Sequence, residues 1–97
     1  MERTATIVCY DICDPKRLRR VYQTCRAFGE HLQYSVFRCD LTPRRRAELV
    51  AALDEVIDHR ADQVLFVMVG PPEGRARTAF EALGRPYTPR RPGAVIV

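Results

Sequence analysis

TATIVCYDICDP, residues 4–15, passes from an apolar, β-branched run to a helix start within a few positions. The run Thr4–Ile12 is typical of a central β-strand. Asp14 and Pro15 are the residue types preferred at a helix N-cap and first helical position, since Asp accepts an otherwise unpaired N–H and Pro has none to lose. We therefore expect a strand followed directly by a helix, with the acidic Asp11 near the end of that strand.

The length and composition limit the class of protein. A chain of 97 residues predicts one domain with a modest core, for which an oligomeric partner would matter. The net charge is +4, and the basic residues are nearly all Arg. Because a guanidinium pairs with phosphate through two hydrogen bonds, this composition favours an anionic partner, although Arg usage can equally reflect genome composition. We find no signal-peptide pattern and no apolar run of bilayer length, so we expect a cytoplasmic protein without membrane contact.

The four cysteines lack a C-x-x-C pair, which argues against a zinc ribbon or a thioredoxin-like motif. Buried, reduced thiols are the favoured interpretation.

Further helices and strands follow from residue spacing. Residues 14–27 predict a helix with an apolar side and a basic side, and Gly29 is expected to end it in a left-handed conformation. Residues 31–41 alternate as one strand or two short ones, and a second helix is predicted from Thr42 to about Arg60. Residues 63–69 are apolar at both parities, as in a strand covered on both faces, so we expect a second copy of the protein to cover one of them.

The C-terminal part is less regular. Residues 75–83 alternate as a strand would, while their Ala and Glu content favours a helix. Residues 84–93 indicate an extended arm, and residues 94–97 a terminal strand able to pair with a sheet edge in its own subunit or in a partner. The order predicts a ferredoxin-like α+β domain (βαββαβ) over residues 1–83, with an arm and C-terminal strand over 84–97 that belong to the same domain or swap onto a dimer partner.

Asp11 is the candidate for chemistry. A lone carboxylate is a poor magnesium site, but a two-fold axis beside Asp11 would bring two carboxylates to one ion, which could activate water for phosphodiester hydrolysis. The alternative is that Asp11 only caps the turn or pairs with a nearby Arg. Asp14 is interpreted as a helix cap. Tyr10 and Tyr34 are interpreted as half-buried sheet residues more than as stacking platforms, although either residue could serve as both.

Two blocks of sequence resemble the CRISPR-associated protein 2 family. The first is Tyr-Asp-Ile at 10–12, followed by Asp14, Arg17, Arg20 and Val21. The second runs from Phe-Gly-Glu at 28–30 through Gln-Tyr-Ser-Val-Phe at 33–37 to Asp-Leu at 40–41. With a terminal strand after a Gly-Arg-Pro stretch, the resemblance spans nearly the whole chain. Leu18 departs from it where a second arginine is common, as does Cys13, where Ser, Pro or Thr is usual.

The resemblance implies a homodimeric, metal-dependent nuclease-like subunit of CRISPR adaptation, in which Asp11 is the catalytic residue and binds Mg²⁺, with Mn²⁺ as the alternative. It further implies supporting or phosphate-binding roles for Tyr10, Arg17, Arg20, Ser35 and Phe37. The implied partners are the CRISPR-associated protein 1 integrase and duplex DNA or RNA. It also makes residues 76–83 a fifth strand.

Two functions stay open at this point. One is endonuclease activity on RNA or double-stranded DNA. The other is a non-catalytic scaffold that holds duplex phosphates and bridges the integrase. A small-molecule regulatory module is a third, less favoured class, because the fold alone warrants no function.

Overall fold

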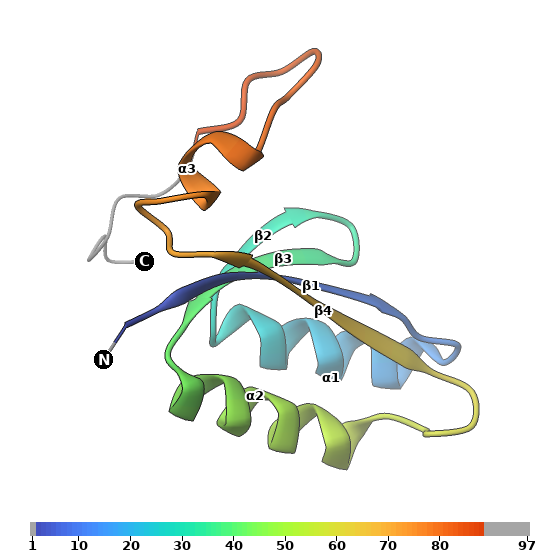
Figure 1. The fold of residues 1–97 in the computed structure, drawn as a ribbon. Helices are drawn as coiled ribbons and strands as arrows, with labels where there is room; N and C mark the ends of the chain where they lie inside the picture. The colour runs from blue at the N-terminus through green and yellow to red at the C-terminus, as the bar shows by residue number, and fades with distance from the viewer. Residues whose placement is uncertain (1, 89–97) are drawn as a thin grey trace.

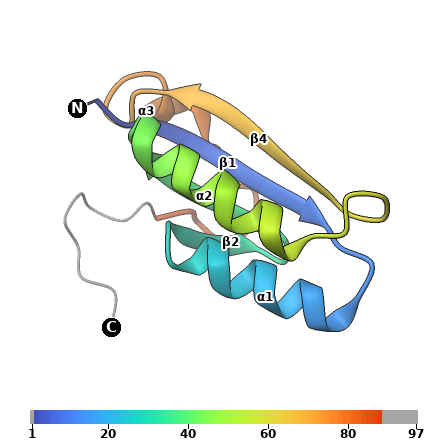
Figure 2. The same ribbon diagram turned by 90° about the horizontal axis from the view of Figure 1, so that it is seen from below.

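A computed structural model describes residues 2–88. The strands are β1 (Thr4–Asp11), β2 (Glu30–Gln33), β3 (Val36–Leu41) and β4 (Gln63–Gly70), and the helices are α1 (Pro15–Arg26), α2 (Pro43–Val56) and α3 (Ala76–Ala79). The strands form one antiparallel sheet in the order β2-β3-β1-β4, with β1 in the interior. Helices α1 and α2 lie side by side against one face of the sheet (Figures 1 and 2). This arrangement confirms the predicted ferredoxin-like α+β fold.

Both main helices begin where the sequence predicts. The side chain of Asp14 accepts a hydrogen bond from the Arg17 N–H at 2.9 Å, and Thr42 Oγ1 accepts one from the Arg45 N–H at 3.1 Å. Each cap is followed by proline at the start of its helix. The caps therefore fix the directions in which the chain leaves β1 and β3.

Helix α2 ends at Val56, earlier than the predicted limit of about Arg60. Beyond it, the Asp62 carboxylate accepts the Asp58 N–H at 2.9 Å, and the Asp58 carboxylate accepts the Arg60 N–H at 2.9 Å. Aspartate side chains that bond nearby backbone groups offer the chain an alternative to further helical turns. These bonds form the turn that leads into β4.

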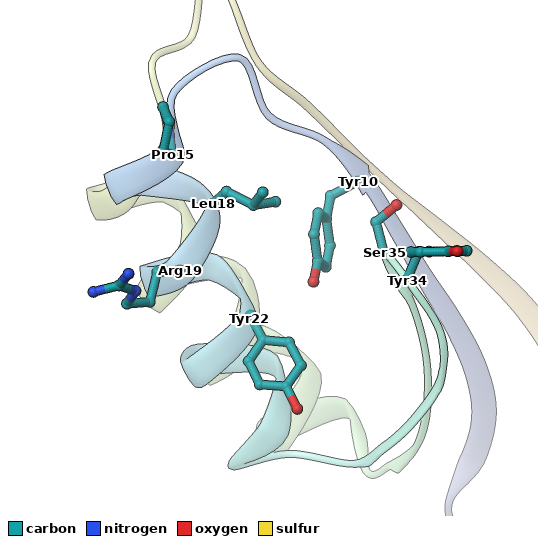
Figure 3. A pocket seen from close by; sticks show the side chains of 7 residues that line it. All are labelled: Tyr10, Pro15, Leu18, Arg19, Tyr22, Tyr34 and Ser35. Atoms are coloured by element: carbon teal, nitrogen blue, oxygen red, sulfur yellow. The ribbon is translucent and has the colours of Figure 1, made fainter.

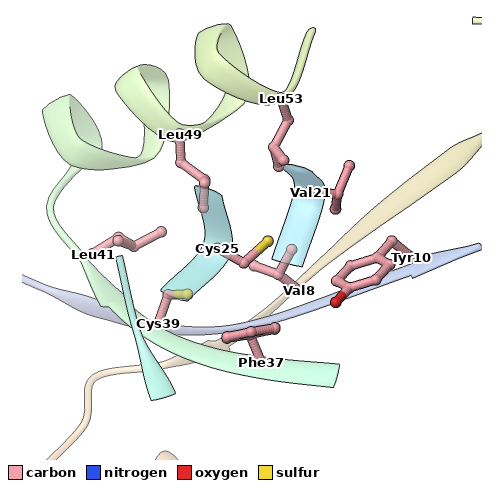
Figure 4. Packing of buried hydrophobic residues seen from close by; sticks show 9 residues of the cluster. All are labelled: Val8, Tyr10, Val21, Cys25, Phe37, Cys39, Leu41, Leu49 and Leu53. Atoms are coloured by element: carbon pink, nitrogen blue, oxygen red, sulfur yellow. The ribbon is translucent and has the colours of Figure 1, made fainter. Parts of the chain in front are cut away.

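The core lies between the sheet and the two helices (Figure 4). Its buried members are Val8, Tyr10, Val21, Cys25, Phe37, Cys39, Leu41, Leu49 and Leu53. Burial raises the pKa of the Cys25 and Cys39 thiols to about 12, so both stay protonated and unreactive at neutral pH. All four cysteines are free, but the prediction of burial is wrong for Cys13, which is exposed.

Gly29 has a different role from the one predicted. Helix α1 ends on Ala27 in a right-handed conformation, and Gly29 is not among the described residues with positive φ. A Cβ at Gly29 would instead lie 2.5 Å from Cys39 Sγ and 2.8 Å from Cys39 Cα. Glycine is needed here because the chain after α1 passes directly against β3.

The interpretation of residues 76–83 as a fifth strand is wrong. The structure forms the short helix α3 at Ala76–Ala79, and in Figure 1 this segment lies across the sheet from α1 and α2. Gly70, with φ of 137°, lets the chain turn away from β4, a conformation that a side chain would strain. The predicted strand at 94–97 lies outside the described residues.

The segment after α3 packs on the sheet through Arg38 of β3. The Arg38 guanidinium bonds the Asp40 carboxylate and the Tyr87 hydroxyl, each at 3.1 Å, and lies 5.1 Å from the centre of the Phe80 ring. Tyr87 in turn donates to Glu30 Oε1 at 3.3 Å. The charge of this nearly buried arginine is therefore paired and covered by aromatic rings.

Gly29→Ala is expected to destabilise the fold by about 2 kcal/mol, because the added methyl group must displace β3 backbone. Chemical denaturation measures the change. Gly74→Ala is the matched control, since its nearest neighbour would be Pro71 Cβ at an ordinary 3.4 Å. A control within about 0.5 kcal/mol of the wild type is expected. Equal effects of the two substitutions would contradict the close approach at Gly29.

Candidate functional site

β1 places consecutive residues on opposite faces of the sheet. Tyr10 faces the helices and is 7% exposed, whereas Asp11 is exposed at the end of the strand. Side chains of a strand alternate, so Asp11 shares its face with Ile7 and Cys9. The predicted catalytic residue therefore lies on the sheet face that α1 and α2 leave uncovered.

That face is apolar beside Asp11. In the antiparallel register Cys9 pairs with Leu65 and with Val36, and Ile7 pairs with Val67, so these five side chains share the face. Leu65 and Val67 are each 51% exposed. We call Ile7, Cys9, Val36, Leu65 and Val67 the open-face patch. The apolar character of β4 at both parities is thus explained on one side by the core and on the other by this patch.

Arg17 forms an ion pair that sequence reasoning did not anticipate. Its Nε lies 2.7 Å from Asp62 Oδ2, and its Nη2 lies 3.2 Å from Oδ1. Asp62 also accepts the Cys13 N–H at 2.9 Å, and the Cys13 thiol donates to the Ala61 carbonyl at 3.0 Å. The carboxylate has no exposed surface. Arg17 is thus engaged in fastening the loop after Asp11 to the turn before β4.

The electrostatics of this pair favour the charged forms. The Arg17 hydrogen bond, followed by the bond from the Cys13 N–H, holds the pKa of Asp62 well below its usual range. The same hydrogen bond raises the pKa of Arg17. Both groups stay ionised at neutral pH.

The other residues predicted to support Asp11 do not gather around its side chain. Phe37 is fully buried in the core, with its ring centre 6.3 Å from that of Tyr10. Ser35 is half-buried in the turn between β2 and β3, where its carbonyl accepts the Tyr10 N–H at 3.1 Å. Arg20 is exposed on α1. By strand alternation, Tyr10 and Phe37 lie on the core side, opposite to Asp11, so they support the sheet from behind.

A pocket of about 470 Å³ opens on the helix side of the sheet (Figure 3). It lies between α1, Tyr10 of β1 and the turn that joins β2 to β3. Its lining residues are Tyr10, Pro15, Leu18, Arg19, Tyr22, Tyr34 and Ser35. The prediction that Tyr34 is half-buried is wrong, because its side chain is 95% exposed at the rim.

A cation at Asp11 would need further ligands. Within residues 2–88, no three His, Cys, Asp or Glu side chains come together as a metal-binding group. An exposed carboxylate still suits Mg²⁺, which commonly takes one or two carboxylates and completes its shell with water and substrate phosphate. The donor chemistry of Asp11 therefore fits a shared site better than one enclosed by a single chain.

The chain matches a known protein family over most of its length. The family described as CRISPR associated protein Cas2 matches residues 4–74. The chain belongs to the Cas2 family. A Rhodospirillum rubrum relative, CRISPR-associated endoribonuclease Cas2 1, is 39% identical over 96% of this chain and 90% of its own. CRISPR-associated endoribonuclease Cas2 of Geobacter sulfurreducens is 38% identical over 94% of this chain and 95% of its own.

Solved structures, one of them of a Cas2 protein, have the same fold. The crystal structure of Streptococcus pyogenes Cas2 aligns with a TM-score of 0.72 and 33% identity, covering 82% of this chain and 99% of that one. A hypothetical protein of Thermus thermophilus aligns with a TM-score of 0.77 and 26% identity, covering 91% of this chain and 99% of that one. In the described part of this Cas2 family member, no helix is both long and apolar enough to cross a membrane.

Sequence reasoning missed Asp62 in this Cas2 family member. Its partners Cys13 and Arg17 lie more than forty positions away in the chain, so no local spacing connects them. The available signal was the pair Asp58 and Asp62, four residues apart between a helix and a strand. Aspartates in such turns commonly bond backbone N–H groups.

Asp62→Asn is expected to lower the thermal midpoint at pH 7 by roughly 5 °C or more, because it replaces the partly buried ion pair with Arg17 by a neutral contact. The pKa of Asp62 is lowered by folding, so its stabilisation is present above the unfolded-state pKa of about 4 and is lost as the pH falls below it. The difference from the wild type should therefore shrink below about pH 4. Thermal unfolding monitored by circular dichroism at pH 7, 4 and 2.5 measures it.

Asp54→Asn is the control for this experiment. Asp54 is 64% exposed and lies 3.2 Å from His59, so its loss should change the midpoint little. An Asp62→Asn effect that is no larger than the control would contradict the structural role of Asp62.

Proposed function

We propose that this protein is a metal-dependent endoribonuclease subunit of CRISPR adaptation, with Asp11 as its catalytic residue. Family membership and the names of the curated relatives support the activity class and RNA as substrate. The observation that carries the site is the exposed carboxylate of Asp11 at the edge of the open-face patch.

The proposal includes a homodimer formed through the open-face patch. Leu65 and Val67, each half exposed, would be removed from water if a second copy packed on them. A two-fold axis there would place the same patch on both sides of the interface and bring two Asp11 carboxylates to one site. The dimer thus supplies the second ligand that one chain lacks.

The chemistry is hydrolysis of a phosphodiester bond. A magnesium or manganese ion, when bound by the two Asp11 carboxylates, would activate water and offset charge on the phosphate. Arg20 is the predicted phosphate contact that remains exposed. Arg17 acts as a positioning residue, because its ion pair holds the loop that follows Asp11.

A scaffold function is the second candidate, and one surface favours it. Arg19, Arg20 and Arg26 on α1 and Arg44 and Arg45 on α2 are exposed. The two helices lie side by side in Figure 2. Such a surface can neutralise duplex phosphates without reading bases. A duplex held in this way, with the CRISPR-associated protein 1 integrase as partner, requires no cleavage.

Asp11→Asn is expected to reduce Mg²⁺-dependent cleavage of single-stranded RNA roughly 100-fold or more, because it removes the carboxylate charge from each half of the site. The measurement is cleavage rate against Mg²⁺ concentration, with duplex binding and dimer mass recorded in parallel. Duplex binding and dimer mass should both be unchanged. The control is Asp54→Asn, because Asp54 is exposed and far from Asp11 in the chain. This variant should cleave RNA at the wild-type rate. Cleavage that persists in purified Asp11→Asn would overturn the catalytic assignment and leave the scaffold function.

Leu65→Glu is expected to convert the dimer into a monomer at micromolar concentration, because two buried, unpaired carboxylates would face each other at the axis. Light scattering after size-exclusion chromatography measures the mass. Val50→Glu on α2 is the matched control, since Val50 is 37% exposed on the opposite layer. A Leu65→Glu protein that stays dimeric would exclude the open-face patch as the interface.

A further inference from the structure

The pocket between α1 and the β2–β3 turn is not used by the proposed cleavage. Tyr10 lines it from the core side of β1, whereas Asp11 faces the other side of the sheet. Its volume of about 470 Å³ lies within the range of small-molecule sites. It is therefore a separate cavity that requires its own explanation.

Aromatic rings dominate the inner wall. Figure 3 shows Tyr10 on the β1 side of the pocket and Tyr22 on the α1 side, with Leu18 extending from α1 toward Tyr10. Planar rings stack on nucleobases of any sequence, and phenol hydroxyls can bond the polar edges of a base. Burial, with smaller effects from Cys25 and Tyr22, raises the pKa of Tyr10 to about 12, so its hydroxyl remains a donor at neutral pH.

The rim carries one positive charge. Arg19 belongs to the lining and extends outward from α1 in Figure 3, where its side chain is exposed. A guanidinium in this place can pair with a phosphate that stays in solvent while the base enters the pocket. The combination of aromatic wall and cationic rim matches a nucleotide better than a purely apolar ligand.

The opposite rim is held in a strained conformation. Tyr34 has φ of 24°, which is uncommon for a residue with a side chain. Its carbonyl lies 2.6 Å from His31 Nε2, and the His31 ring packs against Tyr22 at 5.1 Å and Phe37 at 4.9 Å between ring centres. Strain that surrounding contacts enforce is a feature of ligand sites, because it preforms the binding geometry.

We propose that this pocket binds one unpaired nucleobase, stacked against the half-buried ring of Tyr22, with the adjoining phosphate on Arg19. The source of the base is a free nucleotide or an unpaired position of a nucleic acid strand, which present the same chemistry. The site does not depend on Asp11, so it can be tested in a protein that does not cleave.

The experiment is calorimetric titration of the full chain carrying Asp11→Asn, so that no ligand is hydrolysed. The probes are adenosine 5′-monophosphate, adenosine, inorganic phosphate and an oligoadenylate of four nucleotides. We expect saturable binding of the monophosphate, about tenfold weaker binding of adenosine, and no comparable binding of phosphate alone. A tetranucleotide that binds at least tenfold tighter than the monophosphate indicates a strand as the source, and equal affinities indicate a free nucleotide.

Two variants test the two halves of the pocket. Arg19→Ala should weaken binding of the monophosphate about tenfold, whereas Arg60→Ala, which removes the same charge from an exposed position outside the pocket, should not. Leu18→Trp should fill the pocket with a larger side chain and abolish binding. Leu18 is 42% exposed, so the fold should tolerate the change, and Val50→Trp on α2 is its matched control.

Three outcomes would overturn the proposal. One is the absence of binding by both the monophosphate and the tetranucleotide at millimolar concentration. Another is equal weakening by Arg19→Ala and Arg60→Ala, which would reveal attraction to net charge only. The third is full binding by a folded Leu18→Trp protein. None of them concerns cleavage, so failure here leaves the role of Asp11 unaffected.

Discussion

Pairing of β1 with strands on both sides is the constraint on which the other features depend. Because β3 and β4 fix its register, β1 cannot rotate, and each residue is committed to one face of the sheet. Tyr10 is thereby directed into the core and toward the pocket, and Asp11 toward the open-face patch. Two adjacent residues thus belong to two separate surfaces. A shift of the strand register by one residue would exchange the faces on which they lie.

The loop that follows β1 depends on a contact distant in sequence. A strand end with one exposed carboxylate is mobile unless its following residues are held. Here the Arg17–Asp62 pair and the Cys13 N–H bond join the start of α1 to the turn before β4. Asp14 completes the arrangement by capping α1. Electrostatics and capping together give the end of β1 a defined position.

The sequence predicted most of the fold because its signals are local. Cap-and-proline pairs, alternation and helical spacing each act within a few residues, and they placed both main helices and all four strands of the described sheet. Gly29 was predicted to end α1 in a left-handed conformation, which is wrong. Its actual role, a close approach to β3, is a tertiary contact that local spacing does not reveal. Local signals left residues 75–83 open between strand and helix, because the helix there is only one turn long and too short to show a period. The resemblance to the family then assigned residues 76–83 to a strand, which was wrong. Asp62 and the pocket rim at Arg19 escaped prediction because their neighbours come from distant segments.

The contacts of Arg38 indicate where the cooperative folding unit ends. The family match stops at residue 74, yet this nearly buried guanidinium is covered by Phe80 and hydrogen-bonded by Tyr87. A chain cut at the end of the match would keep the charge and lose its aromatic cover and one partner. The end of the family match is therefore not a boundary of stability. The segment that reaches Tyr87 is integral to the sheet on which it lies.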